Sequence, residues 1–373
     1  MKSVFQEREN CNGCTACKDV CPVSAIEMKR DKEGFLYPAI DEKKCVDCGL
    51  CAVICPVRHK GHYKLLDEPR FFAAKHKNED VLRKSTSGGA FTSLSDVVLD
   101  GGGVIYGADF DESFHVLHKR AEIPEQRDRM RFSKYVQSDL NGVYKQIEND
   151  LKKGIPVLFT GTPCQTAGMR ARFRNPEKSK GLVLCDLICH SIPSPRIWED
   201  YTKLLEDESN GTIAEIRFRS KRHAWSRENS NKGFAYRVKG SDNFKEDDRF
   251  YNLFVKKNYI VRPSCYACKF TDKMRTGDIT IADYFGIEKF APSLYDPLGV
   301  SLIMVSSQKG CDLLNKAARY MHIEERPASE ALSQQNRLSI PGEKPPARET
   351  FWARYYEHGL AEVLKYADGE FPE

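Results

Sequence analysis

Two runs of cysteines with identical spacing lie near the start of the chain, and each run ends in proline. They are Cys11-x-x-Cys14-x-x-Cys17-x-x-x-Cys21-Pro22 and Cys45-x-x-Cys48-x-x-Cys51-x-x-x-Cys55-Pro56. In runs of this kind three thiolates hold one [4Fe–4S] cube and the fourth ligates the other cube. We therefore expect one cluster on Cys11, Cys14, Cys17 and Cys55, and a second on Cys45, Cys48, Cys51 and Cys21.

Zinc sites and disulfides are the alternatives for these eight cysteines. Neither requires two identical four-cysteine runs that each end in proline. The spacing is typical of bacterial two-cluster ferredoxins, so residues 1–60 are predicted to form a 2×[4Fe–4S] ferredoxin-like domain.

Six further cysteines lie outside these runs, at Cys164, Cys185, Cys189, Cys265, Cys268 and Cys311. Cys265-x-x-Cys268 can supply two ligands from one loop, and Cys164 and Cys189 each follow a predicted strand, so they can face one crevice. Cys185 lies about 13 Å further back on its strand. Cys311 fits a small buried hydrophobic residue of a helix. A further cluster is one interpretation, with a zinc site or scattered core cysteines as the alternative.

The bulk composition indicates a globular protein of two or three domains. The chain has 373 residues, of which 40% are hydrophobic and 30% charged, and no apolar run approaches the ~20 residues of a membrane span. The start, MKSVFQEREN, has no apolar stretch, so we expect no secretory signal and a cytoplasmic location. Fourteen cysteines suit metal ligation in a reducing compartment. A net charge of +5 is too small to indicate a nucleic-acid partner.

One basic segment stands out, and it contains Arg217, Arg219, Lys221, Arg222 and His223. We interpret it first as a solvated strand or loop. The alternative is a binding site for an anionic cofactor or a ferredoxin partner.

Helices and strands alternate after the second cysteine run. A helix is predicted after Ser85-Thr86-Ser87-Gly88-Gly89, with stop signals at 101–103. Residues 104–108 and 114–119 predict a strand pair, and 143–151 a second helix that ends before Gly154. Further strands are predicted at 155–159, 181–187 and 278–282. Three cysteine sites therefore lie near strand ends, where α/β folds place chemistry.

The C-terminal part has a different pattern. Pro341, Pro345 and Pro346 indicate a linker. A terminal amphipathic helix is predicted from Phe351, Tyr355, Val363 and Leu364. The expected domains are residues 1–60, 61–335 and 336–373.

Several short sequence motifs of the body, from about residue 70 to about residue 310, resemble those of the β subunits of coenzyme F420 hydrogenases and dehydrogenases. They are Ser87-Gly88-Gly89-Ala90-Phe91, Ser133-Lys134-Tyr135, Gly161-Thr162-Pro163-Cys164-Gln165, Asp186-Leu187-Ile188-Cys189-His190, Pro193-Ser194-Pro195, Cys265-x-x-Cys268 and Gly277-Asp278-Ile279. Together with the cysteine runs, the arrangement is similar to the electron-input subunit of F420H2 dehydrogenases. One departure is Ser191, where the family commonly has glycine.

The resemblance implies that the body binds FAD and one [4Fe–4S] cluster on Cys164, Cys189, Cys265 and Cys268. Its implied fold class is α+β to α/β: a two-cluster ferredoxin-like domain, a mixed α/β flavin-binding domain and a C-terminal helix. No Gly-x-Gly-x-x-Gly follows a strand, so an ordinary Rossmann domain is not indicated.

The same context selects candidate cofactor and catalytic residues. Ser85, Thr86, Ser87, Gly88 and Gly89 precede a helix start, where backbone N–H groups and the helix dipole favour a phosphate. Without a ligand, the same residues would form only a cap. The other candidates are Lys134 for the flavin or its phosphate, His190 for substrate or proton transfer, and Thr162 and Asp283 as cofactor contacts.

The implied function is an iron–sulfur flavoprotein oxidoreductase. A flavin accepts a hydride and releases electrons singly, whereas each cluster carries one electron. We expect hydride exchange with coenzyme F420 or a similar small organic partner, and electron transfer to or from a redox protein, either ferredoxin or a larger complex. The alternatives are a ferredoxin-dependent reductase of a small molecule or polysaccharide precursor, and a polyferredoxin-like conduit without flavin.

Overall fold

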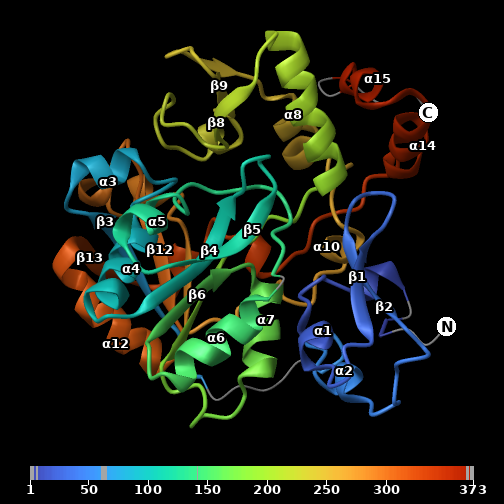
Figure 1. Cartoon of the computed structure of the whole chain (residues 1–373). Coiled ribbons are helices and arrows are strands. Elements are labelled where there is room, and N and C mark those ends of the chain that lie inside the picture. Colours follow the sequence, from blue (N-terminus) through green and yellow to red (C-terminus); the bar gives the residue numbers. More distant parts are fainter. Residues whose placement is uncertain (1–3, 6, 60–64, 141, 367–368, 370–373) are drawn as a thin grey trace.

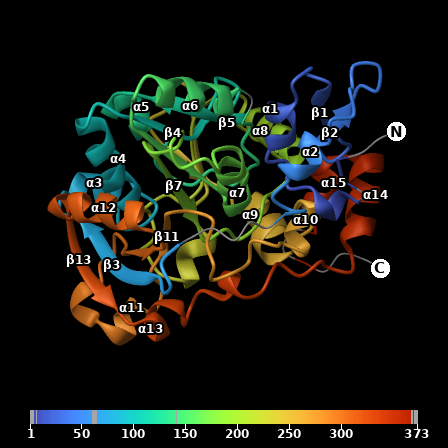
Figure 2. The ribbon, with the colours of Figure 1, turned by 90° about the horizontal axis from the view of Figure 1, so that it is seen from below.

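The computed structural model describes residues 4–5, 7–59, 65–140, 142–366 and 369. Its architecture is mixed α/β, with an N-terminal ferredoxin-type region beside a body that is built on one large sheet (Figure 1). A smaller three-stranded sheet completes the molecule, and the C-terminal helices lie beside the ferredoxin-type region (Figure 2).

The ferredoxin-type region contains two short helices and one hairpin. Helices α1 (Ala16–Val20) and α2 (Leu50–Val53) carry cysteines of the two runs. Strands β1 (Ile26–Arg30) and β2 (Leu36–Ile40) pair antiparallel, with Ile26 opposite Ile40. A one-turn helix, η1 (Arg8–Asn10), precedes them.

The body sheet has eight strands in the order β13-β3-β12-β11-β7-β6-β4-β5. The four inner strands β4, β6, β7 and β11 run parallel, and the flanking strands are antiparallel. Their bounds are β3 Arg70–His76, β4 Val104–Phe110, β5 Val116–Ala121, β6 Val157–Gly161, β7 Leu182–Leu187, β11 Ile279–Asp283, β12 Ser301–Val305 and β13 Met321–Arg326. The inner strands are short apolar runs, as expected for strands covered on both faces.

Helices cover both faces of this sheet. On one face, α4 (Ala90–Asp100) and α12 (Gln308–Ala317) bury Leu94, Leu313 and Leu314 against the sheet. On the other face lie α6 (Val143–Lys152) and α7 (Pro163–Arg172). The remaining body helices are α3 Glu79–Arg83, α5 Pro124–Asp128, α10 Pro263–Tyr266, α11 Ile287–Phe290 and α13 Ala328–Leu332, with one-turn segments η4 Pro292–Leu294, η5 Ala318–Tyr320 and η6 Asn336–Leu338.

The ferredoxin-type region shares a hydrophobic core with α6 and α7. Ala16, Cys17 and Ile54 lie in one buried cluster with Tyr144 and Met169. The tyrosine hydroxyl also donates to the carbonyl of Cys14, at 2.7 Å. This region is therefore held against the body by packing as well as by the chain that connects them.

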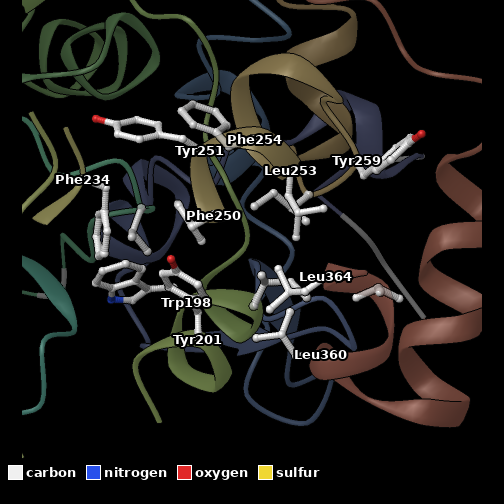
Figure 3. Packing of buried hydrophobic residues seen from close by; sticks show 14 of the residues in the cluster. Trp198, Tyr201, Phe234, Phe250, Tyr251, Leu253, Phe254, Tyr259, Leu360 and Leu364 are labelled. Carbon is white, nitrogen blue, oxygen red and sulfur yellow. The ribbon is translucent and has the colours of Figure 1, made fainter. Parts of the chain in front are cut away.

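A second, aromatic core joins the small sheet to the C-terminal helices. Trp198, Tyr201, Phe234 and Phe250 pack together beside Leu360 and its neighbours (Figure 3). The elements around this core are α8 Pro195–Ser209, β8 Ile213–Arg217, η2 Glu228–Asn231, β9 Ala235–Val238, β10 Phe244–Glu246, α9 Arg249–Tyr251, the π-helix η3 Asn252–Lys256, α14 Arg348–His358 and α15 Leu360–Leu364.

Most predicted elements are present, with small shifts of their bounds. The helix after residues 85–89, the strand pair β4–β5 and strands β7 and β11 are confirmed, while β6 begins two residues later than predicted. The single terminal helix is wrong: the chain forms α14 and α15 instead. Gly359, at a φ of 81° that favours glycine, separates them.

Among the described residues, no helix is both long enough and apolar enough to cross a bilayer.

Candidate cluster and cofactor sites

The first predicted ligand set surrounds a small cavity. Cys11, Cys14, Cys17 and Cys55 line it together with apolar residues that include Val57. Burial raises the pKa of the Cys14 thiol well above its usual value, and its neighbours Cys17, Cys11 and Cys55 raise it further. Four thiols in one apolar pocket fit the donor set of a [4Fe–4S] cube.

The second set lies nearer the surface. Burial, followed by the neighbouring Cys48 and Cys45, raises the pKa of Cys51. Cys48 is exposed, as are Val46 and Val53 beside it. Cys21 directly follows α1, which packs on α2, and its sulfur accepts a hydrogen bond from the Ala25 amide at 3.2 Å.

The structure brings together the four body cysteines implied by the resemblance. Cys164 is the second residue of α7, Cys189 follows β7, and Cys265 and Cys268 lie in and just after α10. Burial raises the pKa of Cys164 to about 11, and Cys268 raises it further. Burial also raises the pKa of Cys189, and the other three thiols raise it further.

The two cysteines left out of the ligand set lie elsewhere. Cys185, which is 1% exposed, and Cys311 belong to the core on the α4 and α12 face of the sheet.

The first cysteine group and the body group are neighbours. Cys55 of the former packs with Cys164 and Cys268 of the latter around Val57 and Phe270. Gly168 of α7 also lies close to the first group, since a Cβ at this position would lie 2.6 Å from the Tyr144 hydroxyl and 3.2 Å from the Cys14 sulfur.

A cavity of about 870 Å³ opens at the carboxyl ends of β4, β6, β7 and β11. This is the edge where parallel sheets place ligands. Eight predicted residues line it, as does Cys189 of the body group: Ser85, Thr86, Ser87, Gly89, Lys134, Thr162, His190 and Asp283. Gly88 does not line it. Its Cβ position lies 2.4 Å from the Ala74 carbonyl oxygen, so this glycine is required for close packing on β3.

The N-terminus of α4 faces this cavity. Gly89 is its N-cap at a φ of 82°, and Phe91 in the first turn is a lining residue. Arg131 also lines the cavity, and its guanidinium donates to the Thr92 hydroxyl at 3.0 Å. Helix end and guanidinium together suit an anionic group such as a cofactor phosphate.

The hydroxyls of the loop before α4 are bonded within the protein. Ser85 donates to Val81, and Ser87 donates to Val300, at 2.6 and 2.8 Å. The Thr86 hydroxyl accepts from the Ser133 amide at 3.0 Å. These side chains hold the loop in position, which leaves the helix end as the anion-binding element.

Lys134 braces the segment that precedes it. Its ammonium donates to the carbonyls of Arg129 and Arg131, both at 2.8 Å, and of Phe132 at 3.4 Å. Burial lowers the pKa of Lys134 to about 7. Three carbonyl acceptors use all three donors of the charged form, so the structure gives this lysine a positioning role. Its predicted catalytic role remains a prediction.

His190 lines the cavity directly after Cys189. Its Nε2 is buried without a hydrogen-bond partner among the described residues, and its ring packs edge-on against Phe254. Burial, together with the charge of Arg337, lowers the pKa of His190 to about 4. A neutral imidazole with one uncommitted nitrogen can accept or donate one hydrogen bond in the cavity.

Asp283 is fixed by two partners at the end of β11. The guanidinium of Arg219 donates to it at 2.6 Å, and so does the indole N–H of Trp225. Burial would raise the pKa of Asp283, but Arg219 and the two hydrogen bonds hold it below its usual value. This carboxylate is therefore charged and oriented at the cavity wall.

The basic segment proves to have two parts. Arg219 lies at the cavity and Lys221 donates to the Thr86 carbonyl, whereas Arg222 and His223 are exposed and face Glu246. The preferred interpretation as a solvated segment thus holds only for its outer residues.

Sequence reasoning missed two arginines. Arg337 lines the cavity and its charge acts on Cys189, Cys265 and Cys268. Arg262 lies between the two cysteine groups. Neither stands in a motif, so only the fold reveals them.

Comparison with known proteins identifies two families along the chain. Residues 156–331 match the family that represents the C terminus of the beta subunit of coenzyme F420 hydrogenase/dehydrogenase. Residues 10–59 match the 4Fe-4S dicluster domain.

Relatives of each part are known. An uncharacterised ferredoxin of Methanocaldococcus jannaschii is 50% identical over 48 residues, which are 12% of this chain and 26% of that protein. The F subunit of the F420H2 dehydrogenase from Methanosarcina mazei is 24% identical over 193 residues, which are 49% of this chain and 54% of that protein. The matches thus span about a quarter and about half of these relatives.

A chain of the xenon-derivatised F420-reducing [NiFe] hydrogenase complex from Methanosarcina barkeri aligns at a TM-score of 0.49 with 17% identity. The alignment covers 77% of this chain and 92% of that one. This chain thus joins a region that matches the 4Fe-4S dicluster domain to a body of which residues 156–331 match the C-terminal family of the coenzyme F420 hydrogenase/dehydrogenase beta subunit.

Proposed function

We propose that the chain is an FAD-dependent iron–sulfur oxidoreductase that exchanges a hydride with coenzyme F420 or a similar organic partner. The observation that carries this proposal is the position of Cys189. It lines the 870 Å³ cavity and also belongs to the four-cysteine body group. A cofactor in the cavity would lie beside a cluster held by these thiols.

The cavity residues fit a flavin dinucleotide. The α4 N-terminus and Arg131 would hold the pyrophosphate, and the Arg219–Asp283 pair would fix the polar wall at the other strand end. When bound, the flavin supplies the conversion between a two-electron hydride and single electrons. The α4 N-terminus, Arg131 and the Arg219–Asp283 pair would orient it.

The order of the cysteine groups favours a relay. Cysteines of the body group and Cys55 of the first ferredoxin-type group pack against the same apolar cluster. The second ferredoxin-type group includes the exposed Cys48, so it lies at the surface of the molecule. We propose that electrons pass between the cavity and a redox protein through these three groups in turn. The partner would be ferredoxin or a component of a larger complex.

A cavity of this size also distinguishes the proposal from a simple conduit. A polyferredoxin-like chain has no use for a pocket within the ~300–1,000 Å³ range of ligand sites. A ferredoxin-dependent reductase of another small molecule would use the same cavity, so the donor experiment must separate these two enzymes.

The test is anaerobic stopped-flow mixing of the purified protein with reduced F420. We expect bleaching of flavin absorbance followed by cluster reduction. In Cys189→Ser, flavin reduction should persist while transfer to the clusters slows at least tenfold, and Cys311→Ser is the matched control. Flavin that stays oxidised with F420 but is reduced by reduced ferredoxin would contradict the F420 assignment and favour the reductase alternative.

A further inference from the structure

Arg262 is a fully buried arginine at the contact between the ferredoxin-type region and the body, with 1% of its surface exposed. Its guanidinium donates to the carbonyls of Cys11 and Leu36, both at 2.9 Å, and to Gln137 Oε1 at 2.8 Å. The cation also lies 4.3 Å from the ring centre of Tyr37. These contacts fix the position of the guanidinium.

No carboxylate offsets this charge among the described residues, since every oxygen that accepts from the guanidinium is neutral. The Cys11 sulfur, which can carry a negative charge, lies 3.8 Å from Nη2. Burial of an unpaired cation is unfavourable, so the neighbouring thiolates are the anions available to balance it.

The other side of Arg262 faces the body group. Arg262 is the N-cap of α10, which carries Cys265, and its amide is held by the Ile192 carbonyl at 2.8 Å. Asn12, next to Cys11, donates to the hydroxyl of Ser264, next to Cys265, at 3.3 Å. Arg262 therefore lies where the segments that carry the two cysteine groups meet.

We infer that Arg262 is a positioning residue for electron transfer, whose buried charge stabilises the reduced state of both the first ferredoxin-type cluster and the body cluster. This inference rests on the proposed function. The step moves one electron from one cluster, which is oxidised, to the other, which is reduced, without making or breaking a bond. An added electron makes a cluster more negative, so a fixed cation nearby favours reduction.

The second ferredoxin-type cluster provides an internal reference. No contact joins Arg262 to Cys45, Cys48 or Cys51 within the described part of the chain. Removal of the Arg262 charge should therefore shift the reduction potentials of the first ferredoxin-type cluster and the body cluster, but not that of the second ferredoxin-type cluster.

The experiment is a redox titration of the anaerobically purified full chain, monitored by electron paramagnetic resonance. In Arg262→Gln we expect the equilibrium constant for one-electron reduction to fall about tenfold at two clusters, which is ~59 mV. Arg262→Lys retains the charge and should recover most of the shift. Gln137→Glu neutralises the guanidinium in place and should lower the same two potentials, so it decides the question if Arg262→Gln does not fold.

Arg30→Gln is the matched control. It breaks an exposed ion pair between the ferredoxin-type region and Glu199 of the body, and Arg30 makes no contact with a thiol among the described residues. Its three potentials should stay unchanged.

Unchanged potentials in both Arg262→Gln and Gln137→Glu would overturn the inference while leaving the proposed function intact. A wild-type chain with iron for only two clusters would instead contradict the proposed function, and with it the action of Arg262 on a body cluster.

Discussion

At the residue scale, the sequence indicated which cysteines lie together, whereas it gave no sign of the arginine contacts around them. Ligand spacing is local, so Cys11 to Cys55 could be assigned from order alone, and the structure also groups Cys164 with Cys268. Arg219 and Arg262 become significant only through partners far along the chain: Asp283 for one and Cys11 for the other. A single arginine carries no local signal for such a contact.

The Arg219–Asp283 pair leads to a prediction about stability and pH. Because its partners hold the folded-state pKa of Asp283 below the unfolded value of about 3.9, the pair stabilises the protein above about pH 4 and less as pH falls through the folded pKa. Asp283→Asn should lower the free energy of unfolding at pH 7 by about 3–5 kcal/mol. It should also flatten the acid limb, which is the fall of this free energy below about pH 4. Chemical denaturation between pH 3 and 7 measures both, and an unchanged acid limb would contradict this account.

Thr162 leads to a second prediction. It is the N-cap of α7 in a capping box with Gln165, and its hydroxyl lies 3.2 Å from the Cys164 sulfur. Thr162→Val should cost about 1 kcal/mol of stability, because the cap loses its oxygen, whereas Thr162→Ser should cost little. Thermal unfolding of both variants checks this, and equal melting temperatures would show that the cap is dispensable.

At the element scale, the sequence predicted strands β4, β5, β6, β7 and β11 and missed strands β3, β12 and β13 on the other side of the sheet. Strands β4, β6, β7 and β11 follow apolar runs with clear helix boundaries between them. Strand β3 pairs with β12, which lies more than 200 residues later, and no local pattern indicates such a partner. The small sheet β8–β10 was missed for a related reason: its polar and exposed positions give its short strands little alternation.

Helix α14 is tied to the ferredoxin-type region by one buried ion pair. The Arg348 guanidinium meets Glu33, with Nη1 at 3.2 Å from Oε1, and also donates to the Val261 carbonyl at 3.1 Å. Arg348→Met should destabilise the protein by about 1.5–3 kcal/mol, because the buried Glu33 carboxylate keeps only the partly exposed Arg8, at 3.1 Å, as its partner.

Equilibrium unfolding measures this cost, and hydrogen exchange should show faster exchange in β1, β2 and α14. Glu357→Gln, on the exposed side of the same helix, is the control. Unchanged exchange in the hairpin of Arg348→Met would contradict a tie between these elements.

At the scale of the whole molecule, the predicted order of parts was a ferredoxin-like region, a body and a tail. Their packing could not be predicted from the sequence. The core that Ala16 and Ile54 share with Met169, and the apolar cluster against which both Cys55 and Cys164 pack, arise only when separate surfaces meet. This packing places the three cysteine groups and the cavity in one series, from which we infer the relay.

The most direct test of this account is the iron, acid-labile sulfide and flavin content of the full chain purified without oxygen. The account predicts about twelve iron atoms, four for each of three cubes, with a matching amount of sulfide and one FAD. Cys265→Ser should retain about eight iron atoms. A wild-type protein with about eight iron atoms and no flavin would contradict the proposed enzyme and leave only an electron conduit.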